Sequence, residues 1–197
     1  MLGLIRLLGG TMIFYTHLIW SLDLMGFFGP KARITSDFAK EFYGSSFAWS
    51  YLHWIESPGM LWTVHILALI ALAMFAAGLF TRVTSVLAFI ITVAYMHRAP
   101  GALFGLDQIN SLLALYLRIA AFSLDNIFAR RGWLNFIPVW LRGDAETVGE
   151  SVTANIAIRM IQLHMCIVYL FAGTGKLLGG SWWDGTAMWQ TFANYEY

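Results

Sequence analysis

Five apolar stretches, separated by polar segments, constrain the fold of this chain more than any other feature of its sequence. The hydrocarbon core of a bilayer is about 30 Å thick, so a helix needs roughly 20 apolar residues to cross it. Lipid offers no partners to backbone N–H and C=O groups, which a helix satisfies internally. We therefore predict an all-α integral membrane protein, a bundle of about five transmembrane helices in a single membrane domain. The domain spans 1–197, with predicted helices over residues 4–28, 60–80, 83–99, 107–124 and 154–178.

Composition supports this class of protein and argues against a nucleic-acid partner. Hydrophobic residues make up 59% of the chain and charged residues only 12%, whereas a typical soluble domain has about 25% charged residues. The formal net charge is +1, and no dense run of Lys and Arg is present. Basic patches of that kind are typical of nucleic-acid binding. The expected partners are therefore the lipid bilayer and other membrane protein subunits.

Two long loops connect the predicted helices. Residues 29–59 are aromatic and mixed in charge, and they are predicted to form an interfacial amphipathic loop after the first helix. Residues 125–152 form the second interfacial loop and contain the pair Arg130 and Arg131. Because arginines favour the cytoplasmic side, this pair and Arg82 in a short turn favour a cytoplasmic N-terminus. The expected location is a bacterial inner membrane.

One face of the last predicted helix is polar over nearly its whole length. Its polar and small residues recur at alternating spacings of four and three, which places them on one side of a helix. Arg159 and Lys176 are 17 residues apart, or roughly 26 Å at 1.5 Å per residue. The polar face therefore runs through most of the depth of a bilayer. It consists of Asn155, Arg159, Gln162, Cys166, Tyr169, Gly173 and Lys176.

Lys176 has two interpretations on the residues alone. It stands near the end of an apolar run, where a lysine commonly anchors a helix by reaching toward the lipid headgroups. It also follows the small residues Gly173 and Gly175. Burial beside such residues disfavours the ammonium form, and a neutral amine can act as a base. Tyr169 and Trp182, near the same helix end, are most simply part of an interfacial aromatic belt.

The fourth predicted helix carries Asp107 and Arg118 on one face, about three turns apart. Charged residues within a span usually face the bundle or an aqueous cavity and have a partner there. Because the two residues are too far apart to pair with each other, their partners are expected on other helices. Asp23 is a candidate partner for Arg118, and Lys176 is a candidate partner for Asp107.

Neither the histidines nor the cysteine predict a metal site. His17, His65 and His164 are single histidines on three different predicted helices. They would hold zinc or haem only if these helices converge, and we predict no metal. Cys166 is the single cysteine. It is interpreted as a small core residue.

Three segments resemble the motifs of one membrane-domain family, in the family's order. Residues 76–98, AAGLFTRVTSVLAFIITVAYMHR, contain a glycine and a Thr-Arg turn between two helices, and an arginine closes the second. Residues 104–131, FGLDQINSLLALYLRIAAFSLDNIFARR, contain a Gly-Asp segment that leads into a helix ending in Ser-Leu-Asp. Residues 158–189, IRMIQLHMCIVYLFAGTGKLLGGSWWDGTAMW, combine Arg and Gln, an apolar run with Tyr, Ala-Gly, Lys-Leu, Trp and an acidic-Gly pair. Over residues 4–197 the chain resembles the vitamin K-dependent γ-carboxylase-like domain, also called the horizontally transferred transmembrane (HTTM) domain.

This resemblance implies a catalytic role for Lys176. The lysine of the family's Ala-Gly-x-x-Lys-Leu motif is proposed as the base that acts on a reduced, vitamin K-type quinone. The quinol then reacts with oxygen and becomes a strong base, which removes a proton from the γ-carbon of a glutamate before carbon dioxide adds. A quinone or another lipid-soluble molecule is the cofactor that this chemistry implies. The candidate ligand-pocket residues beside Lys176 are Arg159, Gln162, Tyr169, Gly173, Asp107, Arg118, Trp182 and Asp184.

Two departures from the family's pattern bear on the predicted function. The sequence ends at Tyr197, soon after the last motif, whereas family members continue with further helices and carboxylases add a soluble substrate-binding domain. The histidine that carboxylases place before the fourth-helix segment has no clear counterpart near Gly105, Leu106 and Asp107. We therefore expect a short or truncated member of the family.

The predicted function is that of a carboxylase-like accessory or structural subunit of a larger membrane complex, without full carboxylase activity. The alternative is a membrane enzyme that uses a reduced quinone to carboxylate or otherwise modify a substrate, with Lys176 as the base. The surroundings of Lys176 distinguish the two. A buried amine beside a carboxylate such as Asp107, in an open pocket, favours the enzyme. Exposure to headgroups or burial against another subunit favours the accessory subunit.

Overall fold

The computed structural model describes residues 2–44, 49–100, 105–119 and 152–193 of the chain. Within these ranges the regular structure is entirely helical, with no β-strand, so the all-α prediction is confirmed for the part of the chain that the structure describes. The chain divides into two compact units. The first unit is Met1–Ile158 and the second unit is Arg159–Tyr197.

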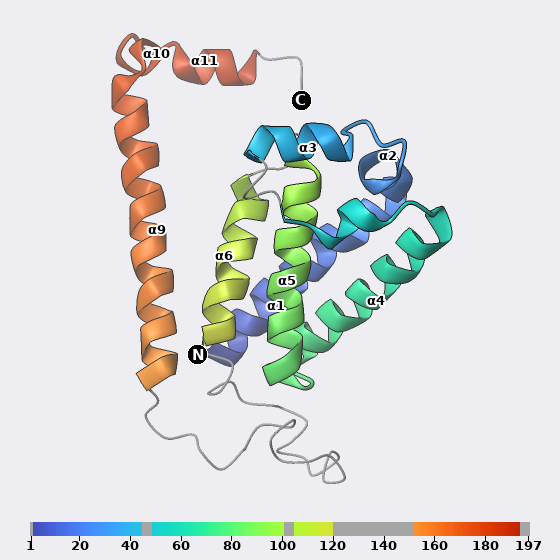
Figure 1. Cartoon of the computed structure of the whole chain (residues 1–197). Helices are drawn as coiled ribbons and strands as arrows, with labels where there is room; N and C mark the ends of the chain where they lie inside the picture. The colour runs from blue at the N-terminus through green and yellow to red at the C-terminus, as the bar shows by residue number, and fades with distance from the viewer. Residues whose placement is uncertain (1, 45–48, 101–104, 120–151, 194–197) are drawn as a thin grey trace. The chain divides into compact units, whose positions relative to one another are not determined.

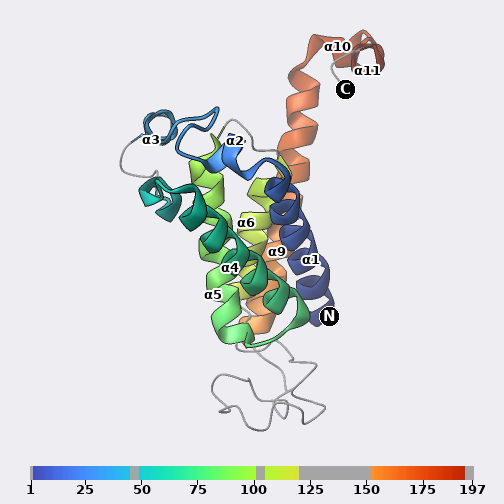
Figure 2. The same cartoon turned by 90° about the vertical axis from the view of Figure 1, so that its right-hand side faces the viewer.

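Among the described residues of the first unit, four long helices form the core, and they alternate in direction along the chain (Figure 1). Helix α1 packs against α4 and α6, and α5 packs against the same two helices, so each long helix has two neighbours. Figure 2 shows α1 and α4 from the side. The bounds are α1 Leu2–Trp20, α4 Pro58–Ala77, α5 Thr81–Arg98 and α6 Gly105–Ile119.

The core between these helices consists of aliphatic and aromatic side chains that are almost fully buried. Close approach of the backbones supports this packing, because Gly10 of α1 lies directly against Ala76 of α4. A Cβ on Gly10 would stand only 2.9 Å from the Cα of Ala76. Dense packing of this kind is typical of protein interiors. The core residues include Ile13, Leu61, Leu72, Phe75, Ala88, Ile91, Tyr95, Ala114 and Leu117.

Residues 4–28, for which the sequence predicts one helix, are divided into three elements. Helix α1 ends at Trp20, a 3-10 helix covers Ser21–Asp23, and α2 covers Leu24–Phe28. Asp23 leaves the helical conformation (φ −140°, ψ 48°), and its carboxylate accepts a hydrogen bond from the Gly26 backbone N–H at 3.2 Å. Aspartate side chains compete in this way with helix hydrogen bonds. The apolar run therefore continues past the point at which the first helix ends.

Helix α4 begins and ends at recognisable caps. Ser57 accepts a hydrogen bond from the Met60 N–H at 3.2 Å, and Pro58 follows in the first turn. Gly78 ends the helix in the left-handed conformation, with φ 83°, and the N–H of Leu79 donates to the Met74 carbonyl at 2.8 Å. The helix predicted over residues 60–80 thus stops before the Thr-Arg turn.

The segment between α2 and α4 lies over the C-terminal end of α5 and contains helix α3 (Ser36–Tyr43) and a 3-10 helix (Tyr51–Trp54). The guanidinium of Arg98 donates to the carbonyl oxygens of Ile34 at 2.7 Å and Gly29 at 3.2 Å. Charged donors make some of the stronger hydrogen bonds in proteins. Arg98 therefore fastens the start of this segment to α5.

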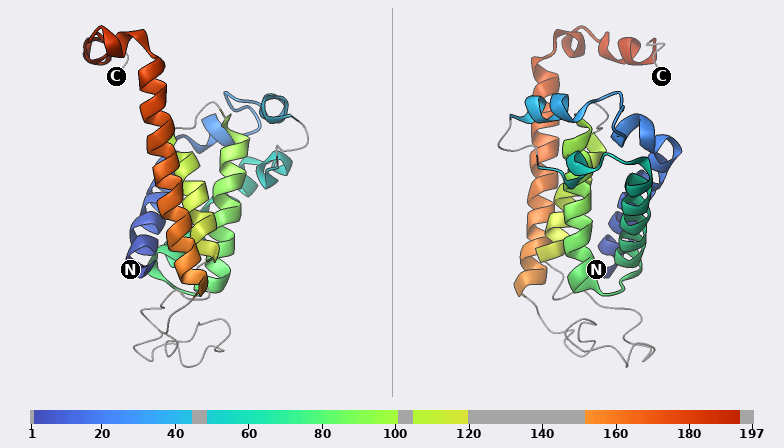
Figure 3. Two further views of the ribbon diagram at one scale, coloured as in Figure 1. Left: turned by 90° about the vertical axis from the view of Figure 1, so that its left-hand side faces the viewer. Right: turned by 45° about the vertical axis from the view of Figure 1, so that its right-hand side comes forward.

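The second unit consists mainly of one helix. Helix α9 runs from Val152 to Leu178 and so begins just before the unit boundary, and two short helices follow it (Figure 3). Its 27 residues correspond to about 40 Å at 1.5 Å per residue. The short helices are α10 (Gly180–Trp183) and α11 (Ala187–Phe192).

Two helices among the described residues are long and apolar enough to cross a membrane by length and composition. They are α4, with a mean hydropathy of 2.2, and α9, with a mean hydropathy of 1.6. Helices α1, α5 and α6 were predicted as further spans, and they do not meet the same criterion over their described residues. Residues 120–124 of the predicted fourth span and most of the loop predicted over 125–152 lie outside the described ranges.

We predict that Gly78→Ala destabilises the protein. A left-handed backbone costs a residue with a Cβ roughly 1–2 kcal/mol, and the new Cβ would meet the guanidinium of the fully buried Arg6. Denaturant unfolding followed by circular dichroism should give a free energy of unfolding lower by at least about 1 kcal/mol.

Gly59→Ala is the matched control for this substitution. Gly59 lies in the first turn of α4, where an added Cβ meets no atom within 4 Å. Its stability should equal that of the wild type or exceed it slightly, since alanine is the better helix former. Equal stability of Gly78→Ala and wild type would contradict the left-handed cap.

Candidate functional site

A chain of hydrogen bonds connects three polar side chains inside the first unit. The hydroxyl of Tyr95 on α5 lies 2.7 Å from Nδ1 of His65 on α4. Nε2 of the same imidazole lies 2.9 Å from Oγ of Ser21, in the 3-10 helix that follows α1. Tyr95 and His65 are both fully buried. Each ring nitrogen of His65 therefore has a partner, and the three elements are joined through this one side chain.

Aromatic rings surround Tyr95 and exclude solvent from the hydrogen-bonded chain. The indole of Trp20 stacks on the Tyr95 ring, with 5.5 Å between centroids and 9° between planes. Phe28 and His17 meet the same ring edge-on, at 4.8 and 4.9 Å. Edge-to-face and offset-stacked rings are the favoured aromatic arrangements. The ends of α1 and α2 thus close over the polar centre.

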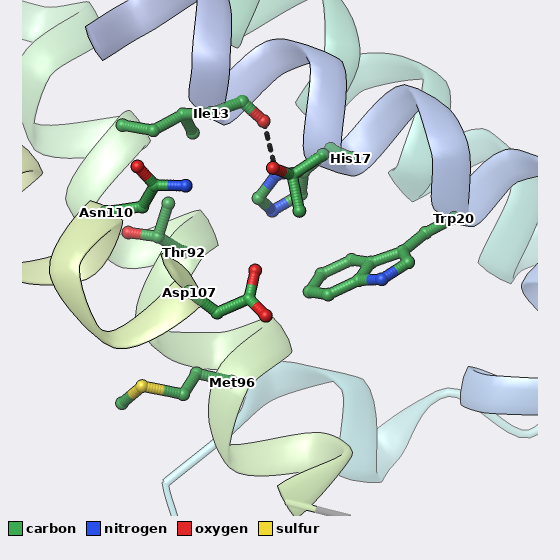
Figure 4. Close-up of a pocket in the computed structure, with 8 residues that line it drawn as sticks. Ile13, His17, Trp20, Thr92, Met96, Asp107 and Asn110 are labelled. Carbon is green, nitrogen blue, oxygen red and sulfur yellow. Dashed lines mark hydrogen bonds between the residues drawn. The ribbon is translucent and has the colours of Figure 1, made fainter. Parts of the chain in front are cut away.

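Beside this cluster a small cavity of about 10 Å³ lies between α1, α5 and α6. Figure 4 shows His17, Asp107 and Asn110 directed toward one space, with Trp20, Thr92 and Met96 around it. The structure therefore places Asp107, a residue selected from the sequence, at a buried cavity of the first unit. The complete lining is Ile13, Thr16, His17, Trp20, Thr92, Met96, Asp107 and Asn110.

Arg118 and Asp23 do not form the pair that the sequence suggested. The Oδ2 atom of Asp23 accepts from the guanidinium of Arg33 at 2.9 Å. Helices α1 and α6 run in opposite directions, and Leu117 beside Arg118 packs near Gly9 in the N-terminal half of α1. Asp23 follows the C-terminal end of α1, so the direction of the helices places Arg118 at the opposite end of the bundle. Arg118 itself is half-buried in the last turn of α6.

The other candidate residues all belong to the second unit, apart from Asp107 and Arg118. Arg159 donates to the side-chain oxygen of Gln162 at 3.1 Å. This bond joins two adjacent members of the predicted polar face, and both side chains are exposed. Tyr169 and Gly173 lie further along α9 and are exposed as well. A Cβ on Gly173 would meet nothing within 4 Å.

The amine of Lys176 lies over an aromatic ring. Its Nζ lies 4.7 Å from the centroid of Trp182, a distance typical of a cation–π contact. The indole N–H of Trp183 donates to the carbonyl of Leu177 at 2.7 Å and so folds α10 back on the end of α9. Lys176 is exposed. The amine, the two tryptophans and the helix end form one compact corner.

Asp184 has a local role in the turn after α10. The hydroxyl and the backbone N–H of Thr186 donate to its Oδ1 atom at 2.6 and 2.9 Å. These two hydrogen bonds hold the pKa of the Asp184 carboxyl below its usual value, because they stabilise the ionised form. The carboxylate therefore shapes the turn that leads into α11.

Sequence reasoning treated His17 and His65 as isolated and did not single out Tyr95. The structure brings all three together, with the ring centroids of both histidines within 6 Å of Tyr95. The available signal was one histidine within each of two apolar stretches, His17 and His65. Among the residues that the structure describes, no group of three or more His, Cys, Asp or Glu side chains could hold a metal ion.

We predict that Tyr95→Phe destabilises the protein by about 1–3 kcal/mol, since it leaves a buried nitrogen of His65 without its partner. The free energy of unfolding, measured in denaturant, tests this. Tyr15→Phe is the control, because Tyr15 is 56% exposed, and it should have no measurable effect. The double variant His65→Leu with Tyr95→Phe should cost less than the sum of the two single changes. Additive effects would show that the two side chains are not coupled.

Comparison with known proteins does not extend this description. A scan against protein-family models, a search of curated proteins and a search of solved structures find no match to the chain. The resemblance to the γ-carboxylase-like membrane domain therefore stays a prediction that rests on the motifs quoted from the sequence.

Proposed function

We propose that the chain is an integral membrane protein that serves as an accessory or structural subunit of a larger membrane complex. The observation that carries the proposal is the distribution of side chains in both units, with apolar rows on the outer helix faces. The role rests on no similarity to a characterised protein. The proposed role follows from the contacts that apolar outer faces can make, which are with lipid or with other membrane chains.

The outer face of α4 is a row of exposed apolar residues. Trp62, Ile66 and Ile70 recur at intervals of four and are 40–51% exposed, and no charged residue occurs between Pro58 and Ala77. On the opposite face Leu61 and Leu72 are fully buried. A helix on the surface of a soluble protein carries polar residues on its outer face. An apolar outer face is suited to lipid or to another membrane chain.

Helix α1 has the same distribution, and polar groups lie inside the first unit. Leu4, Leu8 and Tyr15 are 60%, 62% and 56% exposed, whereas Arg6 and His17 on the same helix are buried. This arrangement would be unfavourable in water, since apolar surface is exposed while the guanidinium of Arg6 and the polar imidazole of His17 are desolvated. It is favourable where the medium outside the bundle is hydrocarbon, which supports a membrane location.

The second unit supports the same proposal. Along α9 the side chains of Leu163, Leu170 and Phe171 are 61–71% exposed. After the end of the helix Trp183 and Trp189 are each 74% exposed, and Lys176 lies against the ring of Trp182. A long apolar helix that ends in lysine and tryptophan is typical of a span with an interfacial belt. The exposed Lys176 on Trp182 is suited to a headgroup anchor more than to a desolvated base, which favours the accessory role over the quinone enzyme.

The single cysteine provides a direct test of the span. Cys166 lies 14 residues after Val152 and 12 before Leu178, near the middle of α9. Its side chain is exposed, so the interpretation of Cys166 as a core residue is wrong. We predict that a water-soluble maleimide fails to label Cys166 in open membranes and labels it fully after SDS is added. Mass spectrometry of the chain measures the labelled fraction. Full labelling in the absence of detergent would contradict a membrane-spanning α9.

The orientation can be tested in a Cys166→Ser background. Ser181→Cys places a single thiol beyond the C-terminal end of α9. Asn155→Cys places one near the start of the same helix. If the N-terminus is cytoplasmic and the chain crosses five times, a membrane-impermeant maleimide added to intact cells labels only Ser181→Cys. Labelling of Asn155→Cys alone would reverse the orientation. Labelling of both thiols from outside would contradict the proposal that α9 spans the membrane.

The accessory role and the enzyme differ in what Lys176 should control. We predict that the tagged chain, purified from its native membranes in mild detergent, elutes with a fixed set of other subunits and without quinone in organic extracts. Lys176→Ala should retain the same set at unchanged stoichiometry, and Lys176→Arg is the charge-matched control. A co-purifying quinone that disappears in Lys176→Ala would overturn the accessory role and support the enzyme.

A further inference from the structure

The cavity beside Tyr95 is lined by several polar side chains, and two of them, His17 and Asn110, lie too deep to use bulk solvent. Its volume is about 10 Å³. His17 from α1 and Asn110 from α6 are only 3% and 5% exposed, and Asp107 faces the same space (Figure 4). A buried polar atom without a hydrogen bond is costly. The hydrogen-bonding capacity of these three side chains therefore determines what the cavity can hold.

The protonation pattern of neutral His17 follows from its one hydrogen bond. Nδ1 lies 2.8 Å from the carbonyl oxygen of Ile13. A carbonyl oxygen can only accept, so Nδ1 carries the hydrogen and donates it. In a neutral imidazole the other nitrogen, Nε2, then has a lone pair and requires a donor. This Nε2 is fully buried and has no hydrogen-bond partner in the structure.

Asn110 presents the opposite requirement. Its Nδ2 amide nitrogen is buried and donates to no acceptor in the structure. Thr92 also lines the cavity, and its hydroxyl already donates to the Ala88 carbonyl at 2.8 Å. The cavity wall thus offers one acceptor from His17, one donor from Asn110 and carboxylate oxygens from Asp107. No direct bond between His17 and Asn110 satisfies either group.

We propose that this cavity binds one water molecule. The water donates one hydrogen to Nε2 of His17 and the other to the carboxylate of Asp107, and it accepts a hydrogen bond from Nδ2 of Asn110. A buried water needs a space of roughly 10–15 Å³ and two to four polar partners, and the cavity meets both conditions. A larger ligand does not fit. An ammonium ion could not accept from Asn110.

The bound water has a structural consequence for the bundle. His17 is on α1, whereas Asp107 and Asn110 are on α6. The water joins the two helices through polar bonds at one level of the bundle, beside the Ser21–His65–Tyr95 chain. It also brings the imidazole of His17 and the carboxylate of Asp107 into one hydrogen-bonded unit.

The test is nuclear magnetic resonance of the full chain, labelled with ¹⁵N in histidine and asparagine side chains and held in lipid nanodiscs. At alkaline pH, where imidazoles are neutral, His17 should show a protonated Nδ1 and an unprotonated Nε2. A cross-peak from a slowly exchanging water should reach both the His17 ring and the Asn110 side-chain amide. A protonated Nε2, or no water contact at either group, would overturn the proposal without any variant.

Two substitutions sharpen the test. Asn110→Leu removes the donor at similar volume, and the water cross-peak at the His17 ring should fall below detection. Thr92→Val is the matched control, since the Thr92 hydroxyl already bonds to the backbone, and the cross-peak should persist. An undiminished cross-peak in Asn110→Leu would show that Asn110 does not hold the water and would overturn the assignment. Loss in Thr92→Val alone would overturn it equally.

Discussion

The hydrogen-bonded chain Ser21–His65–Tyr95 is the interaction on which the first unit most depends. Apolar packing around it is non-directional and tolerates small shifts of one helix along another. A buried imidazole with two short hydrogen bonds does not tolerate such shifts, because each unpaired nitrogen would cost about 1–3 kcal/mol. The bonds at 2.7 and 2.9 Å therefore select one register of α4 and α5 against the end of α1. The stacked Trp20 and the edge-on Phe28 complete this arrangement by keeping water out.

The first unit buries several polar side chains within its apolar core and also exposes apolar side chains on its outer helix faces. Arg98 illustrates how the interior is satisfied, because its guanidinium is almost fully buried and donates to two carbonyl oxygens of the segment that crosses the end of α5. The outer faces of α1 and α4, by contrast, carry rows of exposed apolar side chains. Such a distribution is favourable when the surrounding medium cannot hydrogen-bond and the interior must provide every partner. The distribution of polar and apolar side chains supports the proposed membrane location independently of any motif.

The two candidate centres have different chemical characters. Lys176 lies at an exposed corner with Trp182 and Trp183, where a cation and two indole rings are suited to a lipid–water boundary. Asp107 and His17 lie at an enclosed cavity of the first unit with unsatisfied polar atoms nearby. The sequence directed attention to Lys176, and the structure adds the enclosed centre.

The sequence by itself determined the helical class and the approximate positions of α4, α5 and α9. It also indicated that the side chain of Asp107 faces the bundle or a cavity. Hydrophobic runs and caps such as Ser57 and Gly78 are local signals, and they act within a few residues of where they stand in the chain. Only the tertiary structure decided that Asp23 pairs with Arg33 instead of Arg118, and that His17 and His65 meet at Tyr95. Helices that are apolar on nearly every side give no periodic signal for which face meets which neighbour. That choice is made by close backbone contacts such as Gly10 on Ala76 and by the few polar side chains that must find partners inside.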